Sequence, residues 1–264
     1  MITFQQIRNA TIKLKYPNVT FMIDPWLMDE SPPEERDRAV AARSFIPKPI
    51  CPLPAAAGEL IEDVDIFLLT HVHPDHFSMD YLPADAPFVC QNEQDARQLE
   101  RMGLSNVRYF RDETLSFGSV KITRVDARHG ENEEIAARMG PGSGFVFTCE
   151  GEKTVYTAGD TVFYCGVRAV IDRFKPDVII VNACDARGKL GRLIMNAGDV
   201  MKTCDCKADS LVIASHMGAV SHAHLSREQL KEELAAARYA ERVRIPEDGE
   251  RVEIIASAST VKGP

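Results

Sequence analysis

The stretch Thr-His-Val-His-Pro-Asp-His, residues 70–76, decides what this chain folds into and binds. It follows an apolar run, Ile66–Leu69, that is typical of a buried strand. The end of a strand exposes the next residues at a sheet edge, where open α/β folds place their sites. Four side chains here can ligate a metal, although the whole chain has only seven histidines. Because burying unsatisfied imidazoles is costly, this cluster predicts a metal site.

The spacing of these side chains predicts two metal ions rather than one. His71 and His73 are two residues apart, so they point the same way from an extended segment. Asp75 and His76 then turn toward a second ion. Three imidazoles and a carboxylate on one ion would leave no open position for water, whereas two ions roughly 3.5–4 Å apart can share a bridging hydroxide. We therefore expect two divalent ions.

Three further candidate ligands follow predicted strands later in the chain. They are His129 after residues 115–125, Asp160 after residues 154–158, and His216 after residues 211–214. A single histidine after a strand is weak evidence of a ligand. Three such residues in the same topological position as the first motif predict that all of them meet at one centre.

Strands and helices are mixed along the rest of the chain. Strands are predicted at residues 2–8, 10–16, 19–23, 65–70, 107–110, 115–125, 144–149, 154–158, 177–181, 211–214 and 251–256. Helices are predicted at residues 55–62, 92–102, 167–174, 197–204 and 226–240, with Asn92 and Ser226 as N-caps and Glu228 near the capping-box position. Wholly apolar strands indicate sheets covered by helices. The class is α/β, and without a repeat or linker we expect one domain over residues 1–264.

Residues 31–54 are rich in proline, which few regular elements tolerate. This pattern predicts a mobile or meandering surface segment. Its composition suits a wall or lid of an active site, and it suits a simple connector equally well.

Composition excludes several classes of protein. The net charge of −8 argues against a nucleic-acid partner, because such proteins usually carry a basic excess. No apolar run reaches the roughly 18 residues of a membrane span, and no secretory signal pattern opens the chain. Seven scattered cysteines indicate reduced thiols. We expect a cytoplasmic enzyme with a small-molecule substrate, and a homo-oligomer is compatible with these features.

From residue 10 to about residue 230 the chain resembles the metallo-β-lactamase superfamily. The motifs stand in the order typical of that family: Phe-Met-Ile-Asp-Pro-Trp with Asp24, then His-Val-His-Pro-Asp-His, and then the three later ligands. The resemblance implies a four-layer αβ/βα sandwich of two mixed sheets flanked by helices. It also implies that Asp24 steadies the motif loop, as metal ligands usually require.

The same resemblance implies a role for each ligand. The first metal would be bound by His71, His73 and His129, the second by Asp75, His76 and His216, and Asp160 would bridge the two. Zinc is the first expectation for both ions, with manganese or iron as the alternatives. Asp75 could also take a proton from the bridging water.

Within the superfamily, the chain looks most similar to the ascorbate-6-phosphate lactonase-like hydrolases. The resemblance of this chain to those hydrolases rests on the stretches at residues 10–16, 21–27, 129–130 and 155–161. It implies hydrolysis of a small polar ester or lactone, which includes phosphorylated sugar lactones. A phosphodiesterase on the same dinuclear centre is the alternative. A non-catalytic metal-binding protein is the third hypothesis, against which the complete ligand set argues.

Four further residues are candidates for the surroundings of the metals. His222 either donates a proton or contacts the substrate, or it packs at the start of the helix that Ser226 caps. For His224 we expect the packing role alone. Asn182 and Asp185 follow a predicted strand and are candidate substrate contacts.

Overall fold

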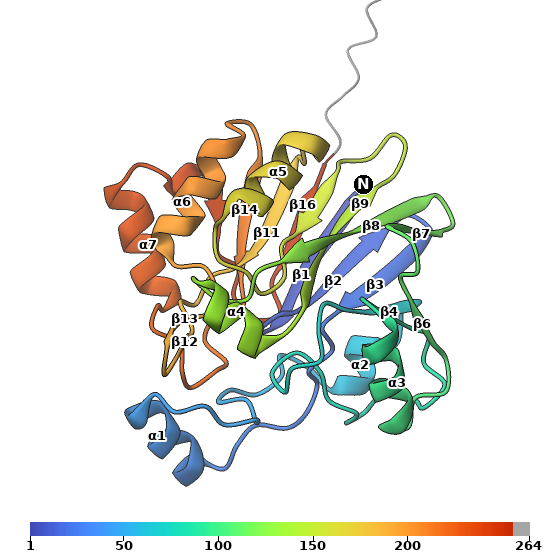
Figure 1. The fold of residues 1–264 in the computed structure, drawn as a ribbon, viewed down its shortest axis with the longest axis horizontal. Helices are drawn as coiled ribbons and strands as arrows, with labels where there is room; N and C mark the ends of the chain where they lie inside the picture. Colours follow the sequence, from blue (N-terminus) through green and yellow to red (C-terminus); the bar gives the residue numbers. More distant parts are fainter. Residues whose placement is uncertain (256–264) are drawn as a thin grey trace, which may run out of the picture.

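Two mixed β-sheets lie face to face at the centre of the computed structural model, which describes residues 1–255 (Figure 1). The first sheet has the strand order β16-β1-β2-β3-β4-β5-β6. Its strands are β1 (Ile2–Arg8), β2 (Thr11–Tyr16), β3 (Val19–Ile23), β4 (Ile66–Leu69), β5 (Phe88–Cys90), β6 (Val107–Tyr109) and β16 (Arg251–Ile254). Pairing is antiparallel from β16 to β3 and parallel from β3 to β6.

The second sheet has the order β15-β14-β11-β10-β9-β8-β7. Its strands are β7 (Thr114–Phe117), β8 (Val120–Ala127), β9 (Gly142–Thr148), β10 (Val155–Thr157), β11 (Val178–Asn182), β14 (Leu211–Ser215) and β15 (Val243–Arg244). The strands β10, β11, β14 and β15 run parallel. Their carboxyl ends therefore meet at one edge of the sheet, where Asp160 follows β10 and His216 follows β14.

Apolar side chains fill the space between the two sheets. Phe21 of the first sheet meets Phe147 of the second, with ring centroids 5.4 Å apart in an edge-to-face arrangement. Phe4, Leu14 and Ile213 belong to the same buried cluster. Alternate residues of β3 and β9 point to this interior, which explains their β-branched and aromatic composition.

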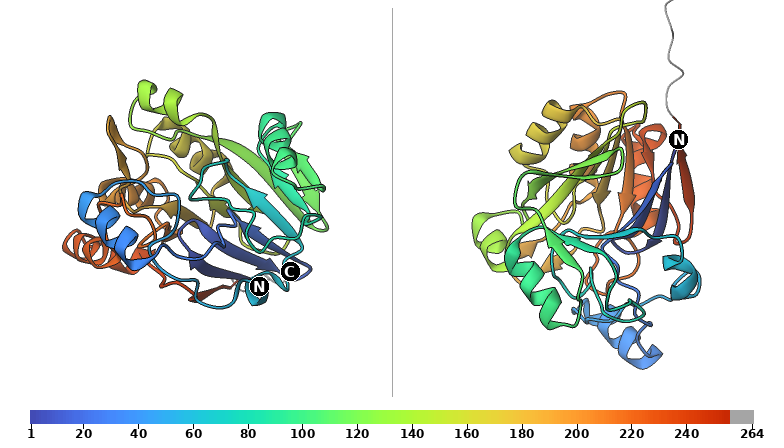
Figure 2. Two further views of the ribbon diagram at one scale, coloured as in Figure 1. Left: turned by 90° about the horizontal axis from the view of Figure 1, so that it is seen from below. Right: turned by 90° about the vertical axis from the view of Figure 1, so that its right-hand side faces the viewer.

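Helices cover the outer face of each sheet (Figures 1 and 2). The helices are α1 (Pro33–Ala42), α2 (Ala57–Ile61), α3 (Glu93–Arg101), α4 (Glu133–Met139), α5 (Cys165–Phe174), α6 (Ala197–Cys206) and α7 (Arg227–Ala236), with the 3-10 turn η1 (Ala240–Arg242). Leu60 of α2 and Leu99 of α3 pack on the first sheet. Ile171 of α5, Val200 of α6 and Leu230 of α7 pack on the second. The four-layer sandwich that the sequence predicted is therefore confirmed.

Some elements differ from the prediction. The predicted strand 115–125 is in fact the hairpin of β7 and β8, which turns at Gly118 with a φ of 57°. The short elements β5 and α4 had not been predicted, and neither had the hairpin of β12 (Arg187–Gly188) and β13 (Gly191–Arg192). In the capping box of α7, Ser226 pairs with Gln229 rather than with Glu228. None of the helices within residues 1–255 is long and apolar enough to cross a bilayer.

The proline-rich segment 31–54 contains the helix α1, so the prediction that it lacks regular structure was wrong. Pro33 is the first residue of this helix, where a missing N–H costs nothing. The segment is also fastened to the body, because the Ile50 N–H donates to the carbonyl oxygen of Ala219. The prolines therefore start the helix and shape its flanks instead of excluding it.

Candidate metal centre

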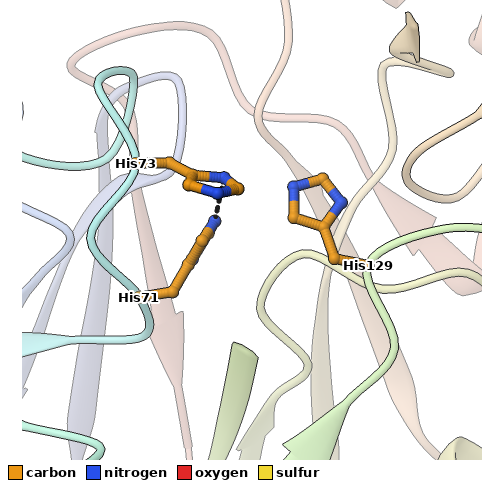
Figure 3. Close-up of side chains that lie close together, drawn as sticks. All are labelled: His71, His73 and His129. Carbon is orange, nitrogen blue, oxygen red and sulfur yellow. Dashed lines mark hydrogen bonds between the residues drawn. The ribbon is translucent and has the colours of Figure 1, made fainter. Parts of the chain in front are cut away.

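The loops that follow four strands bring all seven predicted ligands together. Residues 71–76 follow β4, and His129, Asp160 and His216 follow β8, β10 and β14. Three overlapping groups have potential ligand atoms within 4.8 Å of one another: His71, His73 and His129; His71, His76 and Asp160; and Asp75, His76 and His216. Figure 3 shows the first group, with the His129 ring facing the other two imidazoles across a gap. The first and third groups are the two sets that the sequence assigned to separate ions.

Asp160 lies between these two sets. Its Oδ2 atom is 3.2 Å from Nε2 of His76 and 3.2 Å from Nε2 of His129. Its Oδ1 atom is 3.8 Å from Nε2 of His216. One carboxylate thus reaches imidazoles of both sets, which is the position that a bridging ligand needs.

Each of the five imidazoles uses one ring nitrogen for an outer contact and turns the other toward the cluster. The outer contacts are His71 Nδ1 with Thr70 Oγ1 at 3.0 Å, His73 Nε2 with the Met139 carbonyl at 3.0 Å, His76 Nδ1 with Asp24 Oδ2 at 2.8 Å, His129 Nδ1 with the Leu193 carbonyl at 3.1 Å, and His216 Nδ1 with Cys184 Sγ at 3.6 Å. Such partners set the tautomer and orientation of metal-binding histidines. The Nε2 atom of His76 points toward the cluster. It is buried and makes no hydrogen bond within the described residues. The donor set therefore fits divalent metal ions.

Asp24 supports the motif loop in the way that the sequence predicted. Its Oδ1 atom accepts a hydrogen bond from the Thr70 N–H at 2.8 Å, and its Oδ2 atom holds His76. Asn182 supports the other side, since its Nδ2 donates to Asp160 Oδ1 at 2.7 Å. Asn182 is thus placed to position Asp160 and is absent from the described lining of the cavity.

Asn9 was missed by the sequence analysis. Its Nδ2 donates to the main-chain carbonyl of Asp75 at 2.9 Å and lies 3.2 Å from Nε2 of His216. The only local signal is a turn between two strands, where Asn9 has a φ of 55°. Its partners lie 66 and 207 residues away in the sequence, so no spacing could have revealed the contact.

Gly159 is required where the chain turns into Asp160. Its φ is 64°, and a Cβ atom would lie 2.3 Å from the carbonyl oxygen of Ser143. A larger residue cannot approach the neighbouring strand so closely. The glycine therefore lets the carboxylate of Asp160 sit against the end of β9.

Electrostatics keeps several of the candidate ligands close to their metal-binding protonation states. Burial, together with His76 and His73, holds the pKa of His71 well below its ordinary value. Burial and His129 lower the pKa of His73 to about 4. Although burial acts in the opposite direction, His76, His216 and His129 hold the pKa of Asp160 well below its usual range. Two neutral imidazoles thus face an ionised carboxylate.

His76 and His216 are the exceptions. Burial lowers the pKa of His216, but Asp160 and Cys184 outweigh it and hold that pKa well above its ordinary value. Burial also lowers the pKa of His76, but the nearby carboxylates of Asp160 and Asp24 outweigh that effect and raise the pKa to about 10. The His76 ring is therefore protonated on both nitrogens, and positively charged, at neutral pH when no metal is bound. A metal ion must displace that proton, because only the neutral imidazole ligates.

A cavity of about 820 Å³ opens directly onto these ligands. Asp75, His222 and His224 are among its lining residues, and so are Phe45, Met139 and Leu193. His222 is only 7% exposed, and its buried Nδ1 has no hydrogen-bond partner in the described part of the chain. Its ring meets that of Phe45 edge to face, with centroids 5.4 Å apart. His222 therefore faces the cavity, beside the segment that carries α1.

The remaining candidates take different positions. His224 lines the cavity, with Nδ1 3.1 Å from the carbonyl oxygen of His222. Asp185 pairs with Arg187, whose guanidinium reaches its Oδ2 atom at 2.6 Å, and Asp185 is not part of the described lining. All seven cysteines are free, as the scattered pattern predicted.

Comparison with known proteins identifies the family. A family model described as the beta-lactamase superfamily domain matches residues 20–217. The chain belongs to the metallo-β-lactamase superfamily. The "UPF0173 protein YddR" of Bacillus subtilis (strain 168) is 35% identical over 249 residues, which cover 93% of this chain and 97% of that protein. A "UPF0173 metal-dependent hydrolase" of Methanosphaera stadtmanae is 31% identical over 140 residues, 50% of this chain and 58% of that protein.

Solved structures of the superfamily agree with this assignment. An isothiocyanate hydrolase from Delia radicum gut bacteria is 30% identical, with a TM-score of 0.85 over 96% of this chain and 99% of that chain. A possible metal-dependent hydrolase from Veillonella parvula DSM 2008 has the same identity, TM-score and coverage. This superfamily member is thus a metal-dependent hydrolase, as the sequence predicted. Its resemblance to the lactonase-like branch stays a prediction.

Proposed function

We propose that this hydrolase attacks the electrophilic carbon of a small ester, lactone or isothiocyanate with hydroxide supplied at a dinuclear metal centre. The observation that carries the proposal is the orientation of the five imidazoles, each of which is held from outside and turned toward one cluster that includes Asp160 and borders the cavity. Divalent ions bound there would lower the pKa of water, so that hydroxide is available near neutral pH. Zinc is the ion we expect, with manganese or iron as alternatives.

The proposed ligand sets follow the groups described above. One ion would be held by His71, His73 and His129, the other by Asp75, His76 and His216, and Asp160 would serve both. The carboxylates of Asp75 and Asp160 lie close enough to these histidines to offset the charge of the ions.

Two cavity residues can move protons during the reaction. Asp75 lines the cavity, and its Oδ2 is 3.4 Å from Nε2 of His216, so it is placed to accept a proton from the attacking water. His222 lines the same cavity, and its Nδ1 has no hydrogen-bond partner among residues 1–255. We assign it the donation of a proton to the leaving oxygen of an ester or to the nitrogen of an isothiocyanate.

The walls of the cavity favour a carbon electrophile with an apolar substituent. Phe45, Met139 and Leu193 offer apolar surface beside the metal ligands. The similarity to an isothiocyanate hydrolase at 30% identity, over nearly the full length of both chains, makes isothiocyanates the first substrates to test. Addition of water to such a compound releases an amine and carbonyl sulfide, which requires proton delivery to nitrogen.

Metal analysis tests the proposed centre. We expect two ions per chain after reconstitution, because the seven ligands supply enough donors for two ions that share a carboxylate. Binding should also release protons near neutral pH, since the pKa of His76 is raised to about 10 in the metal-free protein. Elemental analysis measures the stoichiometry, and calorimetry in buffers of different ionisation enthalpy measures the protons. A single ion after full reconstitution would contradict the bridged centre.

A hydrolysis screen tests the reaction class. Metal-replete protein is incubated separately with benzyl isothiocyanate, a sugar lactone, a p-nitrophenyl ester and bis-p-nitrophenyl phosphate. We expect turnover of at least one carbon electrophile above that of the phosphodiester. Faster hydrolysis of the phosphodiester would favour the phosphodiesterase alternative. No turnover by protein that holds two ions would favour a non-catalytic role.

A further inference from the structure

The charged lining of the cavity has an unexpected sign. Apart from Asp75 and Asp160, which are proposed ligands, its formally charged residues are Arg43, Arg187 and Lys189. The chain as a whole carries a net charge of −8. The mouth of the cavity is therefore cationic on an acidic protein.

Two of these cations have no acidic partner. Arg187 is neutralised by Asp185 at 2.6 Å. Within residues 1–255, the side chains of Arg43 and Lys189 form neither an ion pair nor a hydrogen bond, and both residues are exposed. Some exposed basic residues elsewhere are paired, as Arg138 is with Glu134 at 3.0 Å, but these two line the cavity with their charge unpaired. Their charge is therefore free for a ligand.

Arg43 is held at the cavity by the segment that carries α1. It occupies the C-cap of that helix with a φ of 45°, and its N–H donates to the carbonyl oxygen of Val40. The next residue, Ser44, accepts a hydrogen bond from Ser221 Oγ at 2.6 Å. Phe45 then packs on the ring of His222. Arg43 is thus tied to the loop that carries the proposed proton donor.

Lys189 lies at the turn of the β12–β13 hairpin, which lines the same cavity as Arg43. The base of the hairpin is fixed, because the Arg192 N–H donates to Glu131 Oε1 at 2.9 Å and its carbonyl accepts from the Glu131 N–H at 3.0 Å. The guanidinium of Arg192 also contacts Asp199. The two free cations therefore come from separate, anchored elements on one cavity.

We infer that Arg43 and Lys189 form an anion-binding rim that selects substrates with a carboxylate or sulfonate. The acid group would sit at this rim and the apolar part against Phe45 and Leu193, with the electrophilic carbon at the metal centre. Unpaired cations around a partly apolar cleft concentrate anions and raise their affinity. This inference rests on the proposed function for the identity of the reacting carbon, but anion binding can be tested without turnover.

The test uses two probes that differ only in charge, dansylglycine and its neutral amide, in fluorescence titrations of the metal-replete full chain. We expect dansylglycine to bind the wild type roughly tenfold more tightly, since two exposed charge pairs are each worth a few-fold. Replacing both cations, Arg43→Gln with Lys189→Gln, should bring the ratio close to one. Added salt should lower the ratio of the two affinities in the wild type.

Lys121→Gln is the matched control, because Lys121 is an exposed lysine on β8 whose side chain has no ion pair or hydrogen bond in the described residues. Its ratio should stay at the wild-type value. If the double variant still prefers dansylglycine over the amide, the anion binds at the metals and the inference is overturned. If the wild type shows no preference for dansylglycine, the inference is overturned as well. The single variants and an unchanged Tm exclude misfolding as the cause of a lost preference.

Kinetics adds a second readout if the hydrolysis screen finds an isothiocyanate substrate. In that case KM for 4-carboxybenzyl isothiocyanate should rise about tenfold in the double variant relative to KM for benzyl isothiocyanate, with kcat for the acid nearly constant. A fall in kcat without a change in KM would contradict a binding role. Absence of turnover would count against the proposed function alone, because the probe titrations stand independently.

Discussion

Replacing Asp160 with alanine is expected to lower turnover by about 10³-fold or more and to reduce the metal content below two ions per chain. Two unit charges about 4 Å apart interact by about 4 kcal/mol at an effective dielectric constant of 20, and two dications repel several times more strongly. Asp160 reaches imidazoles of both ligand sets, so its loss exposes the ions to this repulsion. A loss of about 4 kcal/mol corresponds to about 10³-fold in rate. Elemental analysis and turnover on one preparation measure both effects.

His224→Ala is the comparison for Asp160→Ala. His224 lines the same cavity, but its Nδ1 contacts the carbonyl oxygen of His222, and it belongs to none of the ligand groups. We expect it to keep two ions and to lose much less activity. Equal losses in the two variants would mean that the bridging role has been assigned to the wrong residue.

His222→Ala should lower turnover by about 10²–10⁴-fold while both ions stay bound. Proton transfer by a well-placed side chain typically contributes that much. Because the buried Nδ1 of His222 has no hydrogen-bond partner in the described part of the chain, its removal breaks no hydrogen bond found there, and we expect little change in Tm. Metal content, Tm and turnover on this single variant separate the three roles that the residue could have.

Ser221→Ala is the control for the loop itself. Ser221 precedes His222 and donates its hydroxyl to the carbonyl of Ser44, so the variant loosens the same contact with the segment that carries α1. Turnover should fall far less than in His222→Ala. If His222→Ala instead lowers Tm and leaves turnover per folded molecule intact, His222 is a packing residue. A fall in its metal content would make it a ligand.

The clustering of the candidate metal ligands was predictable because its signals are local. The motif at residues 70–76 places four candidate ligands on one loop, and each later candidate directly follows an apolar strand. The carboxyl ends of β8, β10 and β14 lie at one edge of the second sheet, and the packing of the two sheets brings the loop after β4 to the same place. The layers of the fold came from the family resemblance, since periodicity alone indicated only an α/β class.

Other features depend on contacts between distant residues and had no local signal. Cys184 belongs to a buried apolar cluster, and its sulfur lies 3.6 Å from Nδ1 of His216. The outer contact of His129 is with a main-chain carbonyl, that of Leu193, which any residue could supply. Whether the Arg43 side chain forms an ion pair depends on which aspartate and glutamate side chains the fold places near it. By contrast, Gly118 is a local turn signal inside the strand predicted at 115–125, and it could have indicated the hairpin found there.

The segment that carries α1 and the β12–β13 hairpin furnish much of the cavity wall, yet neither contributes a proposed metal ligand. Both lie outside the two central sheets. Under the proposed function, chemistry and selectivity reside in physically separate parts of the molecule, as in many enzymes whose loops vary on a constant scaffold. We then expect sequence changes confined to these two segments to redirect the enzyme to a new compound while the reaction step and the stability of the sandwich are retained. They are therefore the natural targets for libraries that seek altered selectivity.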